Sequence, residues 1–130
     1  MDLPDELLYS REHLWIRIEA GSRAVIGITD HAQEALGAIS AIELPDVGDE
    51  LDQDDSFGTV EARKTVAELY APVSGHVQEV NSEVGDSPEI INDDPYDAGW
   101  LLVVEMADSE ELKLLMSADD YLEQISVLEE

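Results

Sequence analysis

Cysteine is absent from this 130-residue chain, and lysine occurs only twice, as Lys64 and Lys113. Without cysteine there are no disulfides, thiol nucleophiles or zinc–thiolate sites. Long apolar runs are also missing, because the strongest, residues 100–104, is too short to span a membrane. The acidic N-terminus lacks the basic region of a signal peptide. We therefore expect one cytoplasmic domain over residues 1–130, with no membrane partner.

Positive charge is scarce as well. Six lysines and arginines stand against 32 aspartates and glutamates, which gives a formal net charge of -26 at pH 7. A surface of this charge repels the phosphates of nucleic acids, so we expect no nucleic acid partner. It also repels itself unless salt screens the charges. Because the acids are spread over every segment, the composition indicates a halophilic, salt-adapted protein rather than an acidic tail on an ordinary domain.

No sequence motif indicates that the chain catalyses a reaction by itself. The three histidines, His13, His31 and His76, are far apart in sequence and lack the usual metal-ligand spacings. Sequence spacing does not exclude a metal site that the fold assembles from all three histidines. The acidic stretch at residues 52–58 places its glycine one position late for a calcium loop. No phosphate-binding loop or nucleophile elbow occurs, so we expect no catalytic residue and no metal.

Alternating apolar and β-branched residues predict a mainly β chain with short helices. The repeated tripeptides Val47–Asp49 and Val84–Asp86 predict two similar turns, and hence two similar half-sheets packed face to face. The predicted strands are residues 14–18, 23–28, 39–44, 57–62, 65–69, 76–80 and 100–106. The predicted short helices are residues 31–36 and 88–92.

The C-terminal segment, residues 108–128, is predicted to be helical. Asp108 followed by Glu111 resembles a capping box that starts one helix, and Ser117 can cap a second. An apolar stripe at helical spacing indicates that the second helix packs on the sheets rather than on a partner. The stripe consists of Tyr121, Leu122, Ile125 and Leu128.

Lys64 lies between two strand-like runs, at or beside the tip of a hairpin that we place at residues 57–75. A hairpin tip protrudes, so an amine there can enter the active site of another enzyme. Pro72 and Gly75 stiffen the segment that follows. An unmodified surface lysine is the simplest alternative. We predict instead that Lys64 is a covalent attachment point for a swinging cofactor, because acylation converts the amine into a long neutral arm.

Several segments together resemble the H-protein family of the glycine cleavage system over nearly the full length of the chain. The resemblance implies a flattened lipoyl/biotinyl-type barrel-sandwich hybrid of two antiparallel sheets, with short helices and C-terminal helices. The segments that carry it are residues 27–37, 43–49, 70–75, 86–92, 94–96 and 99–100.

The same resemblance implies a cofactor and partners. Lys64 would carry lipoate as N6-lipoyllysine, and Glu61 and Gly75 match positions that the lipoylating enzyme recognises in the family. A pyridoxal-phosphate glycine decarboxylase would load the arm with an aminomethyl group. A tetrahydrofolate-dependent aminomethyltransferase would unload it, and dihydrolipoyl dehydrogenase would reoxidise it. The chain would then be a carrier subunit and a shared substrate of these enzymes, not an enzyme itself.

Two departures from the family pattern affect the site. The common Glu-Ser-Val-Lys-Ala is here the segment Glu61–Thr65, and the common His-Glu-Trp is here His13-Leu14-Trp15. The missing glutamate is the residue expected to meet the amine of the loaded arm, and Leu14 cannot pair with a cation. If residues 12–16 form a strand, Glu12 lies on the same face as Leu14 and takes its place. We therefore expect Glu12, His13 and Leu14 to dock the loaded arm.

Two other carrier functions use the same architecture. An H-like protein could store lipoyl groups or relay them to other complexes. A biotinyl carrier shares the hairpin, but methionine usually flanks its lysine, whereas Arg63 and Thr65 stand here. A non-carrier acidic protein that mimics nucleic acid would need no special lysine and would not predict the hairpin.

Overall fold

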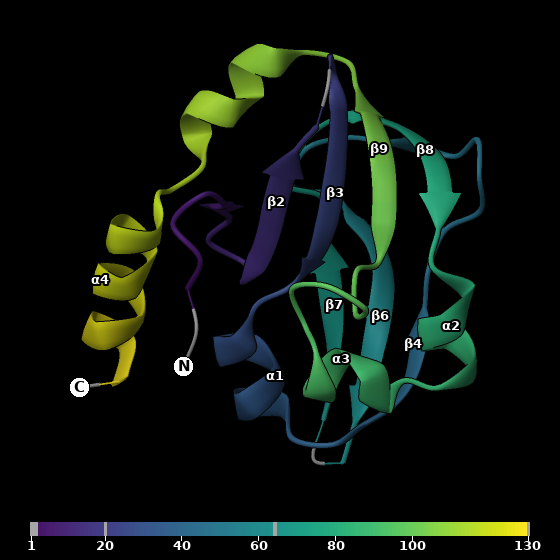
Figure 1. Cartoon of the computed structure of the whole chain (residues 1–130), viewed down its shortest axis with the longest axis vertical. Coiled ribbons are helices and arrows are strands. Elements are labelled where there is room, and N and C mark those ends of the chain that lie inside the picture. Colours follow the sequence, from purple (N-terminus) through teal and green to yellow (C-terminus); the bar gives the residue numbers. More distant parts are fainter. Residues whose placement is uncertain (1–2, 20, 64, 130) are drawn as a thin grey trace.

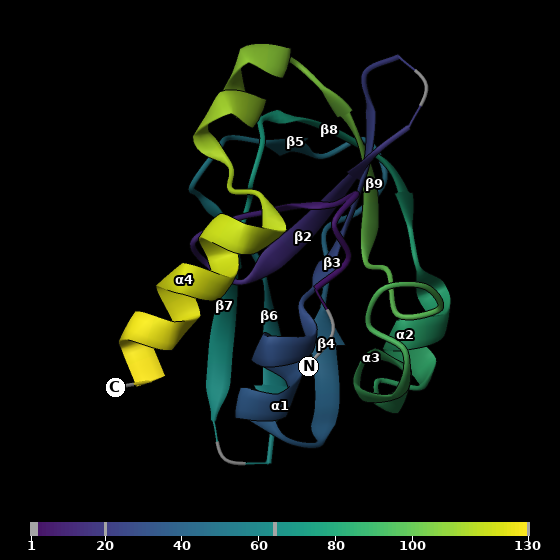
Figure 2. The ribbon, with the colours of Figure 1, turned by 60° about the vertical axis from the view of Figure 1, so that its left-hand side comes forward.

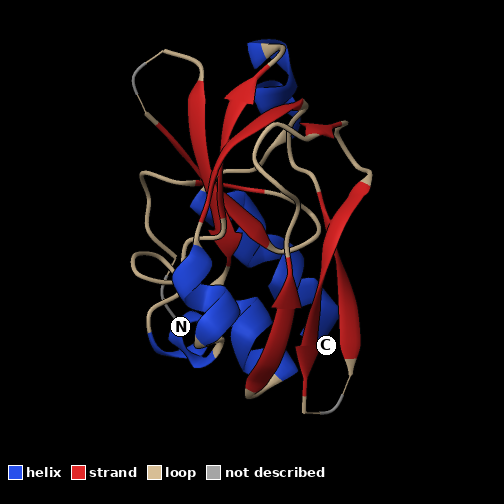
Figure 3. Ribbon diagram, turned by 90° about the vertical axis from the view of Figure 1, so that its right-hand side faces the viewer, coloured by secondary structure: helices blue, strands red, loops and turns tan. Residues whose placement is uncertain are grey.

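The fold is built from two antiparallel sheets that pack face to face (Figures 1 and 3). The structure is a computed structural model that describes residues 3–19, 21–63 and 65–129, with side chains up to Ile125. The larger sheet has the strand order β1-β2-β3-β9-β8-β5. Its strands are β1 (Leu8–Tyr9), β2 (Leu14–Ile18), β3 (Arg23–Ile28), β5 (Glu50–Leu51), β8 (Gly75–Val80) and β9 (Leu102–Met106).

The smaller sheet has the order β4-β6-β7 and contains the predicted hairpin. Its strands are β4 (Ile39–Glu43), β6 (Ser56–Ala62) and β7 (Val66–Tyr70). The main core lies between the sheets and contains buried side chains of both, such as Ile26 and Val60. The predicted mainly β fold of two antiparallel sheets with short helices is confirmed, but the sheets are unequal, so the prediction of two similar half-sheets was wrong.

Three short helices lie together at one end of the sheets (Figure 1). They are α1 (Asp30–Leu36), α2 (Ser82–Asp86) and α3 (Glu89–Asp93). The Thr29 hydroxyl caps α1 by accepting a hydrogen bond from Ala32 N–H at 3.1 Å, and Gly37 ends it at φ 80°. Among the described residues, no helix has the length and apolar character needed to cross a membrane.

The second copy of the Val-Gly-Asp tripeptide is not a turn. Residues 84–86 lie inside α2, where the Asn81 side chain caps the helix by accepting from Glu83 N–H at 3.1 Å. Only Gly48, in the first copy, has the positive φ, 95°, that favours glycine in a turn. The prediction of two equivalent turns was therefore wrong, because the preceding cap residue decides the local structure.

The capping box predicted at Asp108 and Glu111 is confirmed at Asp108, which caps the helix, and was wrong at Glu111. Residues Ser109–Leu114 form a 3-10 helix, η1, and Asp108 accepts from Glu110 N–H at 3.0 Å. The Glu111 carboxylate instead accepts hydrogen bonds from Ser74 N–H at 2.7 Å and from Ser74 Oγ at 2.8 Å. Glu111 therefore joins η1 to the segment before β8 rather than capping its own helix.

The last helix, α4 (Ala118–Glu129), lies beside the N-terminal segment and β1, at one edge of the larger sheet (Figures 1 and 2). Ser117 Oγ accepts from Asp120 N–H at 3.2 Å, which confirms the predicted cap. Tyr121 and Ile125 are buried in a second apolar cluster with Trp15. Leu122 is 45% exposed, so its place in the predicted apolar stripe was wrong, and the Leu128 side chain lies outside the described part of the chain.

Candidate functional site

The turn between β6 and β7 is tight and anchored. Ala62 N–H donates to the Thr65 carbonyl at 2.8 Å, so only residues 63 and 64 lie between the two bonded residues. Arg63 N–H donates to the Ala38 carbonyl at 3.1 Å, which ties the turn to the connection between α1 and β4. The predicted hairpin is confirmed, whereas Lys64 itself lies outside the described residues.

Exposed side chains surround this turn. Glu61, Arg63 and Thr65 are exposed, and Val66 is 60% exposed. Glu61 pairs with Ala41 on β4 and with Val66 on β7, on the outer face of the smaller sheet. A shallow hollow of about 290 Å³ lies on this face and is lined by Ala41, Ile42, Glu43, Thr59, Glu61 and Val66. Glu61 is therefore exposed on the strand that leads into the turn.

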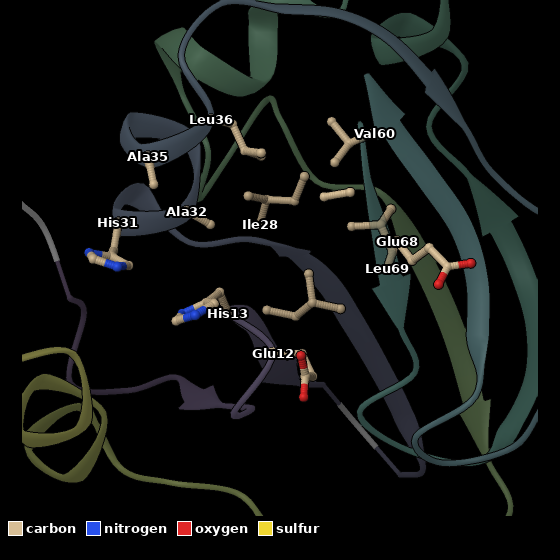
Figure 4. A pocket seen from close by; sticks show the side chains of 12 residues that line it. Glu12, His13, Ile28, His31, Ala32, Ala35, Leu36, Val60, Glu68 and Leu69 are labelled. Atoms are coloured by element: carbon tan, nitrogen blue, oxygen red, sulfur yellow. The ribbon is translucent and has the colours of Figure 1, made fainter. Parts of the chain in front are cut away.

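A cavity of about 160 Å³ lies between the hairpin, α1 and the start of β2 (Figure 4). Its floor is mostly apolar, and Figure 4 shows the carboxylates of Glu12 and Glu68 on the side away from His31. The wall at Ala67 is three residues beyond residue 64, or about 10 Å of extended chain. The lining residues are Glu12, His13, Leu14, Ile28, His31, Ala32, Ala35, Leu36, Val60, Ala67, Glu68 and Leu69.

Glu12, His13 and Leu14 all line this cavity, but not for the expected reason. β2 begins at Leu14, so residues 12–16 are not one strand and the alternation that related Glu12 to Leu14 was wrong. His13 turns the chain instead, with a φ of 70° that is uncommon for a non-glycine residue. Leu14 is buried in the core, 1% exposed, while Glu12 is exposed at the mouth of the cavity.

Two histidines meet a tyrosine beside the cavity. The ring centroids of His13 and His31 are 5.3 Å apart, although 18 positions separate the residues in the chain. His13 Nδ1 is hydrogen-bonded to the Tyr121 hydroxyl at 2.7 Å. Burial and the nearby His31 lower the pKa of His13, and burial raises the pKa of Tyr121 to about 12. Both groups are therefore neutral at pH 7.

Sequence reasoning did not identify Glu68, His31 or Tyr121 as part of this region. Glu68 pairs with Thr59 on the row of residues that faces away from the core, so strand alternation alone gives it no place in the cavity. β7 is an edge strand, and Figure 4 shows the Glu68 side chain at the cavity. His31 carried one usable signal, because it follows the Thr29 cap and so lies in the first turn of α1.

Gly75 is far from the turn along the sheet. The β6–β7 turn and the start of β8 lie at opposite ends of the molecule in Figure 1. Gly75 pairs with Leu51 of β5 and Met106 of β9. A Cβ atom at this position would lie 2.8 Å from Val104 Cγ1 and still closer to the Glu105 carbonyl oxygen. Close contact between strands therefore gives glycine a structural purpose here.

Metal-ligating groups do not gather elsewhere in the part of the chain that the structure describes. No three histidine, aspartate or glutamate side chains there form a group that could hold a metal ion. His76 is exposed in β8 and lies outside the group formed by His13 and His31. The fold thus assembles two of the three histidines, but not the site of three that sequence spacing left open.

Comparison with known proteins gives one consistent result. The family model described as Glycine cleavage H-protein matches residues 7–127 of the chain. The chain is 55% identical over 125 residues to the glycine cleavage system H protein of Halalkalibacterium halodurans, covering 96% of this chain and 97% of that protein. It is 54% identical over 121 residues to the corresponding protein of Oceanobacillus iheyensis, covering 93% of this chain and 95% of that protein.

A solved structure agrees with the sequence comparisons. The crystal structure of a glycine cleavage system H protein from Mycobacterium marinum superposes with a TM-score of 0.87 at 38% sequence identity. The match covers 95% of this chain and 99% of that one. The likeness therefore includes both sheets and most of the C-terminal segment.

Proposed function

The chain belongs to the glycine cleavage H-protein family, and we propose that Lys64 is the residue through which it acts, carrying lipoate as N6-lipoyllysine. As a member of this family, the chain is the lipoyl carrier of the glycine cleavage system. The lipoyl group, when bound, supplies the sulfur that takes up the aminomethyl group. The chain itself has no cysteine that could compete for this chemistry.

The observation that supports Lys64 most strongly is the geometry of the turn that contains its position. The bonds of Ala62 to Thr65 and of Arg63 to Ala38 hold both sides of the turn in place. The exposed residues on either side leave room for the catalytic site of another enzyme. A fixed base under a long arm raises the local concentration of the cargo at successive active sites.

We further propose that the cavity beside α1 docks the loaded arm through Glu12, His13 and Leu14. Leu14 supplies apolar surface, and Glu12 supplies the carboxylate that the family has at the position of Leu14. The cargo ends in an amine, which is a cation when protonated, and a carboxylate at the cavity mouth attracts it. Glu12 therefore takes over the missing acid from a turn position instead of a strand position.

The partners follow from the carrier function. The glycine cleavage system implies glycine decarboxylase and the aminomethyltransferase, between which the chain carries the aminomethyl group as a shared substrate. We propose dihydrolipoyl dehydrogenase and a lipoylating enzyme as the remaining partners. Glu61 meets the lipoylating enzyme beside the turn, and Gly75, at the start of β8, is the second recognition position.

Three broader properties are part of the same proposal. Residues 1–130 act as one lipoyl-type domain, in which residues 57–75 present the arm and residues 108–128 form the C-terminal helical segment. The cytoplasm is the proposed location. The net charge of -26 suits a solvent rich in salt, because concentrated salt screens repulsion between the carboxylates.

Intact-mass measurement of the natively expressed protein tests the attachment site. We expect the mass increment of one lipoyl group, which the variant Lys64→Arg loses and the variant Lys113→Arg keeps. Lys113 is a matched control because it is the only other lysine, and its ammonium pairs with Glu110 on the surface. A biotinyl increment, or a lipoyl increment that survives in Lys64→Arg, would contradict the proposal.

The Glu12 proposal has a separate test. The lipoylated protein is loaded by glycine decarboxylase, freed from the enzyme, and followed for loss of the amine. We expect faster loss from Glu12→Ala than from Glu110→Ala, which removes an exposed carboxylate from η1. An unchanged rate in Glu12→Ala would show that Glu12 does not replace the missing acid.

A relay that only donates lipoyl groups to other complexes is the weaker alternative. The family model and the relatives that match over nearly their whole length favour the glycine cleavage carrier. The biotinyl carrier is likewise not favoured, since the match is to the H-protein family.

A further inference from the structure

The hydroxyl of Tyr121 connects two walls of the cavity between the hairpin, α1 and the start of β2, which we call the arm cavity. It lies 2.7 Å from His13 Nδ1, in the turn before β2, and 2.9 Å from Thr29 Oγ1, at the start of α1. His13 lines the cavity, and so do several residues of α1. Tyr121 itself comes from α4, the helix that lies beside β1 at the edge of the larger sheet. One side chain of the C-terminal helix thus holds both the turn and the helix that border the cavity.

The direction of these hydrogen bonds follows from the donors present. Among the described contacts, the Tyr121 oxygen is the acceptor within hydrogen-bond distance of the Thr29 hydroxyl, so we assign the Thr29 proton to it, while Thr29 Oγ1 accepts from Ala32 N–H. The Tyr121 hydroxyl then donates its single proton to His13 Nδ1. A neutral imidazole that accepts at Nδ1 carries its proton on Nε2. The chain Thr29–Tyr121–His13 therefore fixes one tautomer of His13.

We propose that Tyr121 is a positioning residue for the loaded arm, which holds His13 in its Nε2–H tautomer and keeps the cavity wall closed against α1. The role rests on the proposed use of this cavity by the arm. It makes α4 part of the arm site, although none of the side chains described for this helix lines the cavity.

The packing around Tyr121 explains why a single hydroxyl can have this effect. Tyr121 is 0% exposed, and its ring stacks on Tyr9 with centroids 4.9 Å apart and planes 8° from parallel. The stack fixes the position of the ring, so the hydroxyl reaches His13 and Thr29 without a cost in side-chain entropy at each bond. His13 has a positive φ, and its ring is held at this position by the bond to Tyr121.

Tyr9 supplies a matched control within the same stack. Its hydroxyl donates to the Pro4 carbonyl at 2.7 Å and does not contact His13. Tyr121→Phe and Tyr9→Phe therefore each remove one buried hydroxyl and keep the stacked rings. Tyr9→Phe loses one hydrogen bond and Tyr121→Phe loses two, so we expect the lower urea midpoint for Tyr121→Phe. The tautomer of His13 then reports on the contact with His13 separately from stability.

The first measurement uses the full-length protein without lipoate, with ¹⁵N-labelled histidine. In the wild type and in Tyr9→Phe, we expect the nitrogen shifts of neutral His13 to show a single Nε2–H tautomer. In Tyr121→Phe, we expect a mixture of tautomers, because Nδ1 has lost its donor. This readout does not depend on lipoylation, so it stands even if the attachment at Lys64 is disproved. A single unchanged tautomer in Tyr121→Phe would overturn the proposal.

The second measurement uses the lipoylated and loaded protein, and follows loss of the amine after the protein leaves glycine decarboxylase. We expect Tyr121→Phe to lose it about tenfold faster than the wild type, the factor that corresponds to about 1.4 kcal/mol. Tyr9→Phe is expected to keep the wild-type rate. Equal acceleration in both variants would mean that α4 acts only through general stability, and would overturn the assignment to Tyr121.

Discussion

Gly75 provides a direct test of how closely β8 and β9 pack. In the variant Gly75→Ala, the added methyl group would lie 2.8 Å from Val104 Cγ1 and closer still to the carbonyl oxygen of Glu105. The carbonyl belongs to the backbone of the neighbouring strand, so it cannot turn away as a flexible side chain could. The two strands must separate locally, and the hydrogen-bonded pairs around Met106 are disturbed with them.

The expected size of the effect is the difference between two opposing terms. Overpacking a close contact costs about 1–3 kcal/mol, whereas replacing glycine by alanine within a strand gains about 0.5–1 kcal/mol. Because the clash is with backbone, we expect the upper part of the first range and a net loss of about 2 kcal/mol in the free energy of unfolding. At about 4 °C per kcal/mol for a chain of this size, Tm should fall by about 8 °C.

Gly85→Ala is the matched control. Gly85 lies inside α2 and its added Cβ would meet nothing within 4 Å. Alanine there should stabilise the protein by about 0.5–1 kcal/mol, because glycine is the poorer helix former. Urea unfolding of both variants measures the contrast. A Gly75→Ala protein as stable as the wild type would refute the packing argument. Loss of lipoylation in a Gly75→Ala protein that stays fully folded would show direct contact with the lipoylating enzyme.

Three further predictions concern the rest of the molecule. Glu111→Ala should lower the free energy of unfolding, measured in urea, by about 1.5–3 kcal/mol, because a carboxylate with two hydrogen bonds to Ser74 is lost. The control Glu110→Ala should lower it by under about 1 kcal/mol. Equal effects would contradict the bridging role of Glu111. Between pH 7 and 5.5 the unfolded chain binds more protons at His13 than the folded chain, whose His13 pKa is lowered, so this residue contributes a loss of stability as pH falls. The wild type should therefore lose more stability than His13→Gln over this range, with His76→Gln as the exposed control, and parallel curves would count against the buried imidazole. Raising salt from 0.1 M to 1 M shortens the screening length from about 10 Å to about 3 Å, and should raise the urea midpoint of a chain with net charge -26; a falling midpoint would argue against salt adaptation.

The parts of the fold that sequence predicts well are those set by local pattern. The β6–β7 hairpin follows from two alternating runs, and the ends of α1 follow from Thr29 and Gly37. The tripeptides at Val47 and Val84 show the limit of such patterns. The same three residues form a turn in one place and lie inside a helix in the other, because Asn81 caps the second. The tripeptides themselves do not distinguish the two structures, but Asn81, three positions before Val84, does.

The candidate site was harder to predict, because its residues come from separate elements. His13, His31 and Tyr121 are brought together by a turn, a helix start and the C-terminal helix, and no spacing in the sequence relates them. Glu111 likewise depends on a distant residue, because its carboxylate is hydrogen-bonded to Ser74 instead of forming the predicted local cap. Glu12 was placed at the cavity by an argument about strands that the structure does not support, since His13 turns the chain there.

The most direct test of the carrier function is glycine-dependent loading followed by mass spectrometry. The lipoylated protein is mixed with glycine decarboxylase and glycine, and its intact mass is recorded before and after addition of the aminomethyltransferase with tetrahydrofolate. We predict a gain of one aminomethyl group that depends on Lys64, is absent in Lys64→Arg, is kept in Lys113→Arg, and disappears after the transferase acts. A lipoylated wild-type protein that gains no mass from glycine would contradict the account.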